Sequence, residues 1–216
     1  MRVSFLKLHL LITLLFMTTM NSQAQTIDSC DIKTGDLLFR EKVTASLSQA
    51  IDQVTQTNQE THFSHVGLAV VEQGSVFVLH ASSVGGTCKV SLNEFTHSES
   101  DSTQVFVYRL KQPYRKGIPQ AIQKAYSMLG KPYNFSYVLS DSSHYCSEFI
   151  YKAFQHDSIF KMNPMTFKDP VTGKFVDTWV KHYEDLGISI PEGLPGCNPN
   201  GMAASEKLQK LGLLLR

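Results

Sequence analysis

The interpretation of this chain begins at Tyr145-Cys146-Ser147-Glu148-Phe149-Ile150. Apolar side chains recur behind the cysteine at the spacing of an amphipathic helix, at Phe149, Ile150, Ala153 and Phe154. The pattern predicts that Cys146 lies in the first turn of that helix, where unpaired N–H groups and the helix dipole favour a thiolate and lower a thiol pKa. A lone cysteine is more often a buried structural residue. The histidines upstream favour a nucleophile instead.

Two histidines are predicted to lie at the same end of a β-hairpin. The runs 65–71 and 75–80 are apolar and rich in β-branched residues, and Glu72-Gln73-Gly74 lies between them. A turn of two or four residues puts His65 and His80 on one face, and a bulge at Gly74 restores that face for a three-residue turn. Cys146 then supplies a thiol, His65 takes its proton, and His80 fixes the tautomer of His65.

Separated motifs extend this pattern along the chain, in the order Gly35-Asp36-Leu37-Leu38-Phe39, Ser64-His65-Val66-Gly67-Leu68, Gly130-Lys131-Pro132-Tyr133-Asn134-Phe135 and Tyr145-Cys146-Ser147-Glu148-Phe149. Together they resemble the YiiX/YebB-like amidases, which are circularly permuted relatives of the NlpC-type papain-fold peptidases. The resemblance covers roughly residues 30–205, and His65 precedes Cys146 as in the permuted branch. It implies an α+β, papain-like fold in which an antiparallel sheet packs on the helix that carries the nucleophilic cysteine.

Two positions depart from the family pattern. The position of His80 is often a carboxylate in relatives, although the lecithin-retinol-acyltransferase-like branch has histidine there. A neutral histidine accepts a hydrogen bond from His65 but stabilises its imidazolium less than a carboxylate does. The residue after Tyr133 is often Asp and is Asn134 in this chain.

Further side chains near the cysteine are candidates for oxyanion or substrate binding. Tyr133 and Tyr145 flank the loop before the helix, and a tyrosine hydroxyl beside the nucleophile can donate to a developing oxyanion. Glu148 is expected to be a helix-start charge, with substrate-amine binding as its second role.

The remaining pattern predicts scaffold elements and no second domain. We expect helices at 43–54, 118–129 and 202–213, a short amphipathic segment at 175–183, and strands within 75–95 and at 104–110. The C-terminal region is expected to line one wall of the cleft.

Residues 1–24 have the pattern of a signal peptide. Arg2 and Lys7 precede an apolar run from Leu8 to Met17, and small residues follow at Ser22 and Ala24. The apolar run is shorter than the ~20 residues that span a bilayer. We therefore expect cleavage after Ala24 and a secreted, periplasmic or extracellular domain of residues 25–216. The net charge of +1, without a basic run, argues against nucleic acid as a partner.

The chain has 4 cysteines. If Cys146 stays reduced as a nucleophile, at most one intramolecular disulfide joins two of Cys30, Cys88 and Cys197, and the sequence leaves the pair open. A zinc site is disfavoured because no Cys-x-x-Cys pair occurs and His62-x-x-His65 begins a strand. No cofactor is expected.

These features predict a cysteine hydrolase of amide bonds, with cell-wall peptides or related small amides as substrates. Two alternatives remain open at this stage. The same thiol–imidazole chemistry acts on esters, which would make the protein a lipid acyl hydrolase or acyltransferase. A binding module that retains the residues without turnover is the third interpretation.

Overall fold

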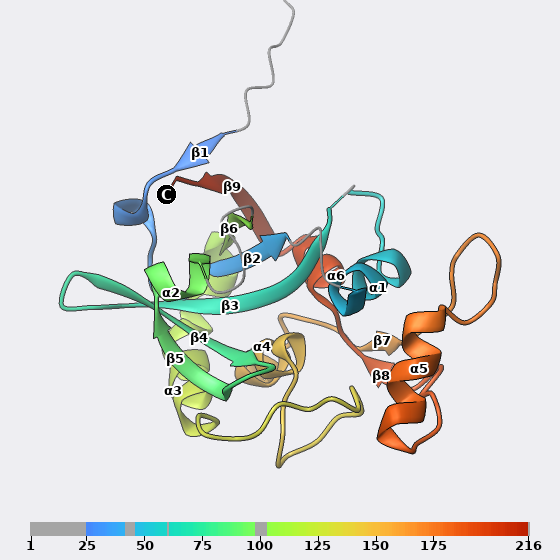
Figure 1. Ribbon diagram of the computed structural model, residues 1–216. Helices are drawn as coiled ribbons and strands as arrows, with labels where there is room; N and C mark the ends of the chain where they lie inside the picture. Colours follow the sequence, from blue (N-terminus) through green and yellow to red (C-terminus); the bar gives the residue numbers. More distant parts are fainter. Residues whose placement is uncertain (1–24, 42–45, 60, 98–102, 216) are drawn as a thin grey trace, which may run out of the picture.

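The computed structural model describes residues 25–41, 46–59, 61–97 and 103–215. Figure 1 shows a central twisted sheet with helices on both of its faces and a helical C-terminal region to one side. The predicted signal peptide and Val43 lie outside the described residues. None of the helices in the described ranges is both long and apolar enough to cross a bilayer.

The sheet has seven strands in the order β1-β9-β6-β2-β3-β4-β5. Their bounds are β1 Thr26–Ile27, β2 Leu37–Glu41, β3 Phe63–Glu72, β4 Ser75–Ser82, β5 Gly86–Ser91, β6 Gln104–Leu110 and β9 Leu208–Leu214. Neighbouring strands are antiparallel except for β1 and β9, which pair in parallel. The predicted antiparallel sheet is therefore correct for all but this edge pair.

One face of the sheet packs on two helices, α3 (Ile118–Ser127) and α4 (Cys146–Ala153). Val66, Leu68 and Leu79 form a buried core with Phe149 and Ile150 of α4 on this side. Burial of such side chains stabilises the packing by about 1.5–3 kcal/mol each. The predicted amphipathic helices at 118–129 and behind Cys146 are confirmed.

The opposite face of the sheet is covered by α2 (Leu92–His97). Phe95 of this helix packs with Leu38, Ala69 and Val78 in a second buried cluster. Because successive strand residues point to opposite faces, β3 contributes Val66 and Leu68 to one cluster and Ala69 to the other. The segment around Phe95 was expected to be a strand, and it is a helix.

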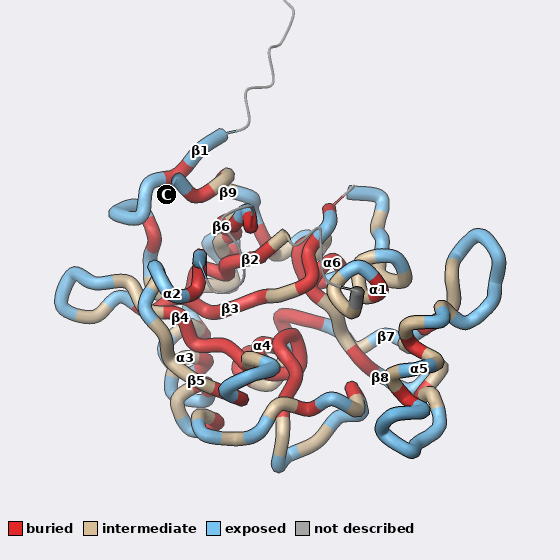
Figure 2. Tube along the Cα trace, in the orientation of Figure 1, coloured by how far each residue is buried: buried red, intermediate tan, exposed pale blue. Residues whose placement is uncertain are grey.

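The C-terminal region packs as a third cluster around α1 (Ser46–Val54) and α5 (Asp177–Leu186). Trp179 of α5 is buried and donates from Nε1 to the carbonyl of Ala50 at 3.3 Å. Smaller elements complete the chain, namely β7 Asn163–Pro164, β8 Pro195–Gly196, α6 Pro199–Ala203 and the 3₁₀ turns Ser29–Asp31, Gln112–Gly117 and Gln155–Asp157. In Figure 2 the buried chain is concentrated in β2, β3, β4 and α4, while the loop that precedes α5 is exposed.

The expected terminal helix at 202–213 is wrong. Residues Leu208–Leu214 form β9, which lies between β6 and β1. Gly212 has φ 150°, and a Cβ atom there would lie 2.0 Å from the carbonyl oxygen of Gln25. This glycine permits the close approach of β1.

Candidate active site

The β3–β4 hairpin brings His65 and His80 together. Its turn is Gln73-Gly74, with φ values of 49° and 80°, the left-handed pair that suits a tight hairpin. The register pairs Leu68 with Leu79, so His65 and His80 are diagonal neighbours on one face. Nε2 of His65 lies 2.8 Å from Nδ1 of His80. The predicted shared face is confirmed.

The phenyl ring of Phe95 and the guanidinium of Arg40 lie near the two imidazoles. Phe95 lies 5.8 Å from His65 and 5.2 Å from His80 between ring centroids. Arg40 is the cross-strand neighbour of His65 on β2, and its guanidinium lies 4.9 Å from the Phe95 centroid. Burial and the Arg40 charge lower the pKa of His80 to about 3 and hold the pKa of His65 well below its usual value. Both imidazoles are neutral at neutral pH, so His65 is able to accept a proton.

Cys88 contacts the far side of His80. It lies directly opposite His80 in the β4–β5 register, and its Sγ is 3.5 Å from Nε2 of His80. Burial raises the pKa of the Cys88 thiol, and the charge of Glu94 raises it further. The sequence does not single out Cys88, because the β4–β5 register that places it opposite His80 is not readable from local pattern.

Cys146 begins α4, as predicted, and is buried. The backbone N–H groups of Val66 and Ser147 favour the thiolate and act to lower the pKa of this thiol. Burial raises the pKa of the thiol to about 11, and these N–H groups offset only part of that effect. The helix start was expected to lower this pKa, and burial raises it instead, because desolvation outweighs the N–H groups of the helix end.

The Cys146 thiol and the His65 ring approach the same point of β3 from different sides. Val66 packs with Cys146 on the α4 side, whereas His65 packs against Phe95. Among the described residues, the hydrogen bond of the His65 ring goes to His80, and none joins it to Cys146. Hydrogen bonds between catalytic groups are often long without ligand and shorten when substrate binds.

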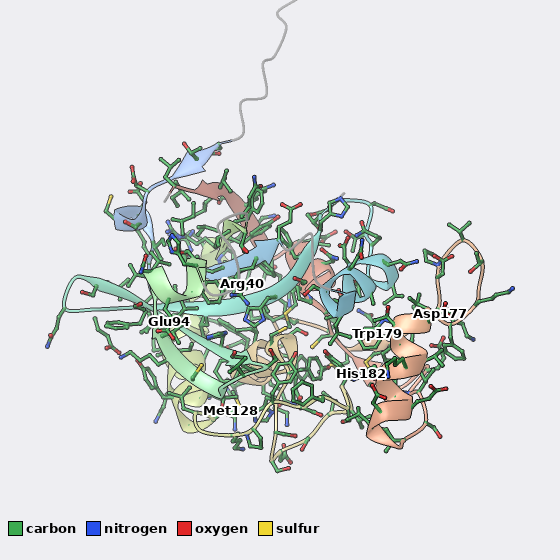
Figure 3. The ribbon with its side chains drawn as sticks, in the orientation of Figure 1. Arg40, Glu94, Met128, Asp177, Trp179 and His182 are labelled. Carbon is green, nitrogen blue, oxygen red and sulfur yellow. The ribbon has the colours of Figure 1, made fainter. Side chains whose placement is uncertain are left out.

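Two cavities connect these groups. One is lined by Cys146 and the other by His65, and Ile51, Ser64 and Tyr137 line both. Trp179 lines the first cavity and Arg40 the second, and both side chains are labelled in Figure 3. The thiol and the imidazole therefore face adjoining cavities that share three lining residues.

The tyrosines of the cysteine loop differ in their partners. The Tyr145 hydroxyl accepts a hydrogen bond from the Cys197 N–H at 3.3 Å and lies 3.8 Å from the Cys197 sulfur. Burial raises the pKa of Tyr133 and Tyr137, and proximity to the Cys146 sulfur raises both further. Tyr137, which the sequence did not single out, therefore lies near the thiol, whereas the Tyr145 hydroxyl is held by Cys197.

Glu148 is fully buried and stabilises the loop before α4. Its carboxylate accepts from the N–H groups of Tyr145 at 3.3 Å and Ser140 at 2.8 Å, and from the Asn134 amide at 3.2 Å. The expected helix-start charge is confirmed as part of a capping box. These contacts occupy the carboxylate and leave no exposed oxygen for a substrate amine.

The side-chain amide of Asn134 uses both its nitrogen and its oxygen in hydrogen bonds. Its side-chain nitrogen donates to Glu148 and to the Val138 carbonyl, while its oxygen accepts from Ser136. An aspartate would place a second carboxylate against Glu148.

Comparison with known proteins identifies the family of this chain. Residues 31–212 match the model of a family described as permuted papain-like amidase enzyme, YaeF/YiiX, C92 family. The chain belongs to this family. A curated relative, the uncharacterized protein YiiX of Escherichia coli (strain K12), is 31% identical over 125 residues, which are 57% of this chain and 58% of the relative. This match thus spans little more than half of that relative's length.

A solved structure supports the fold of the permuted papain-like amidase. The crystal structure of the metalloprotein YiiX from Escherichia coli O157:H7 matches with a TM-score of 0.66 and 24% identity. The match covers 82% of this chain and 95% of that one. The family predicted from the separated motifs is confirmed by the match over residues 31–212, and the solved structure agrees with its fold.

All four cysteines are free thiols in this structure. Cys30 is exposed, Cys88 and Cys197 are half-buried, and Cys146 is buried. A free Cys146 is the state that a nucleophile requires.

Proposed function

We propose that this amidase-family member hydrolyses small amides with Cys146 as nucleophile, His65 as proton acceptor and donor, and His80 as the group that orients His65. The observation that carries the proposal is the 2.8 Å contact between Nε2 of His65 and Nδ1 of His80, on the strand whose Val66 packs with Cys146 at the start of α4. This is the order of nucleophile, base and orienting group that acyl transfer requires.

The reaction begins from a neutral thiol and a neutral imidazole. As the Cys146 sulfur attacks the carbonyl carbon, the thiol proton passes to His65 and a C–S bond forms. The C–N bond then breaks and His65 gives the proton to the leaving amine. Water attacks the thioester next, so that a C–O bond forms, the C–S bond breaks, and one proton of the water returns to sulfur through His65.

The backbone at the start of α4 stabilises the oxyanion. The Cys146 N–H belongs to the first turn, where amide groups lack partners within the helix. Tyr137 and Tyr133 lie near the sulfur and are further candidate donors, and the Tyr145 hydroxyl would first have to leave Cys197.

A metal does not fit this site. Within the described ranges, no group of three or more His, Cys, Asp or Glu side chains is placed to hold an ion. Both ring nitrogens of His80 are already engaged, by His65 and by Cys88. The description of the solved relative as a metalloprotein is thus not matched by the donors found in this chain, and no step of the mechanism uses a metal.

The test is turnover by the purified protein on peptidoglycan fragments, small N-acyl amides and acyl esters, followed by mass spectrometry. A hydrolase releases free acid and amine, whereas an acyltransferase passes the acyl group to an added amine or alcohol. Cys146→Ala should remove activity, and Cys30→Ala, which alters an exposed thiol, should keep it. Amide turnover that survives in Cys146→Ala would refute the proposed nucleophile, and absence of any turnover would favour a binding module.

The location of this activity is part of the proposal. The charged, apolar and small-residue segments of 1–24 support export to the periplasm or the medium. Cell-wall peptides are one substrate class available there, and they form one arm of the test.

A further inference from the structure

The cavity beside Cys146 differs in chemistry from the cavity beside His65. Apolar and aromatic side chains form much of the Cys146 cavity, among them Ile51, Met165 and Trp179, and its polar lining is neutral, as at Ser147 and Asn163. Of the described residues, no Asp, Glu, Lys or Arg contributes to its lining. By contrast, the His65 cavity includes the charged side chain of Arg40.

The direction of the reaction assigns one half of the substrate to each cavity. The carbonyl carbon becomes bonded to the Cys146 sulfur, so the acyl chain occupies space that reaches this sulfur. The leaving amine takes its proton from His65, so it departs on the side of His65. The acyl half therefore lies in the apolar cavity and the amine half in the polar one.

We propose that the Cys146 cavity selects a short, uncharged, apolar acyl group. This inference rests on the proposed function and names the substrate class of the same site. Burying a carboxylate in such a cavity without a cation costs far more than burying a methyl group. A γ-glutamyl group, which carries a carboxylate on its acyl half, does not suit the cavity.

The size of the cavity limits the acyl chain. Its volume of about 110 Å³ is comparable with that of apolar protein cavities of ~150 Å³ that admit benzene. A hexanoyl or phenylacetyl group has this size, and a long fatty acyl chain exceeds it. Simple amides with six-carbon acyl groups are the expected optimum.

Matched substrates test the proposal directly. Hexanoyl and adipoyl amides of 7-amino-4-methylcoumarin have equal chain lengths and the same leaving amine, and they differ in a terminal carboxylate. We expect kcat/KM to be about 100-fold higher for the hexanoyl amide, as befits a buried charge without a partner. The γ-glutamyl amide should resemble adipoyl, and the decanoyl amide should be no better than hexanoyl.

A charge introduced into the cavity should change this preference. Val54 ends α1, is partly exposed and lines the cavity, so that a polar side chain can be accommodated there. Val54→Lys should raise kcat/KM for the adipoyl amide about tenfold and lower it for hexanoyl, through pairing of the ammonium with the carboxylate. Val54→Gln is the matched neutral control and should not favour adipoyl.

The outcomes separate the two proposals. Equal or better turnover of the adipoyl and γ-glutamyl amides by the unaltered protein would overturn the apolar acyl site and leave the Cys146-dependent amidase intact. Turnover of none of these amides, or turnover that persists in Cys146→Ala, would overturn the proposed function and this inference with it.

Discussion

Nε2 of His65 and Nδ1 of His80 lie 2.8 Å apart, and this contact links the tautomers of the two rings. If His65 is to accept the thiol proton at Nδ1, its Nε2 carries hydrogen and donates to His80. The neutral His80 then carries its own hydrogen on Nε2, which faces the Cys88 sulfur at 3.5 Å. Cys88 therefore supports the productive tautomer of His65 indirectly, through its contact with His80.

The histidines should differ in how strongly they affect the rate. Removing a general base costs about 10²–10⁴-fold, so His65→Ala should fall to background. His80→Ala should retain measurable activity, because the nucleophile, the base and the oxyanion donors remain. Steady-state kinetics on one amide, with circular dichroism to confirm folding, measure both effects. A mild His65→Ala beside an inactive His80→Ala would exchange their roles.

Cys88 and Cys146 offer a second comparison. Cys146→Ala should abolish turnover, whereas Cys88→Ala should lower kcat by about tenfold or less, as expected for loss of one member of a hydrogen-bonded network. Cys88→Ser keeps an acceptor for His80 and should recover most of the loss. An inactive Cys88→Ala with an active Cys146→Ala would instead identify Cys88 as the nucleophile.

How far the sequence predicts this site can be seen at the histidines and at Cys88. His65 and His80 belong to a hairpin whose β-branched runs and Gly74 are local signals, so their shared face could be predicted although the turn length was left open. Cys88 lies opposite His80 because of the β4–β5 register, and Arg40 lies opposite His65 because of the β2–β3 register. Strand pairing of that kind is set by packing of the whole sheet, which a single sequence does not show.

The errors have physical causes of the same type. Leucine has a high helix propensity, and the segment contains Leu208, Leu211, Leu213 and Leu214. It forms a strand because its backbone pairs with β6 on one side and β1 on the other. The helix start beside Cys146 is a local feature and was predicted correctly, while the desolvation that raises its pKa comes from the tertiary packing around it.

The buried histidines make stability depend on pH. Burial lowers the pKa of His65 and His80 below the unfolded value of about 6.5, so below that pH the unfolded chain binds protons that the folded state excludes. Stability is complete above pH 6.5 and declines as pH falls toward the folded pKa, which for His80 is about 3. Each histidine adds a slope of about 1.4 kcal/mol per pH unit.

His80→Gln isolates one of these contributions. Urea unfolding between pH 7 and pH 4 should show a slope shallower by about 1.4 kcal/mol per pH unit than that of the unaltered protein. His156→Gln, at an exposed histidine, is the control and should leave the slope unchanged. Equal slopes in all three proteins would show that His80 is protonated equally well in both states.

The loop before α4 provides a stability prediction. Asn134→Asp replaces a donor to Glu148 with a carboxylate and should cost about 3 kcal/mol at pH 7, as for a broken buried pair. The loss should shrink at pH 5, since protonation of one carboxyl removes the repulsion. Asn134→Asp combined with Glu148→Gln restores a donor–acceptor pair and should recover much of the stability in a double-mutant cycle. A neutral effect of the single change would mean that the ammonium of Lys152, 3.5 Å from the Glu148 carboxylate, offsets the added charge.

His80→Glu tests the resting protonation state of the site. Arg40 already lowers the pKa of His80 by its positive charge, so a carboxylate at this position has a cation nearby. The carboxylate accepts from His65 Nε2 and stabilises the imidazolium, so it raises the pKa of His65. Activity should therefore be retained at pH 8.

The direction of the pH shift then decides between two mechanisms. If the site rests as thiol and neutral imidazole, as the raised pKa of Cys146 and the lowered pKa of His65 indicate, the acid limb of kcat/KM reports protonation of His65. That limb should lie well below pH 6.5 in the unaltered protein and move to higher pH in His80→Glu. A thiolate–imidazolium pair would respond in the opposite sense, because the added carboxylate would preserve the pair to lower pH. A limb that moves downward in His80→Glu would thus rule out the neutral resting state.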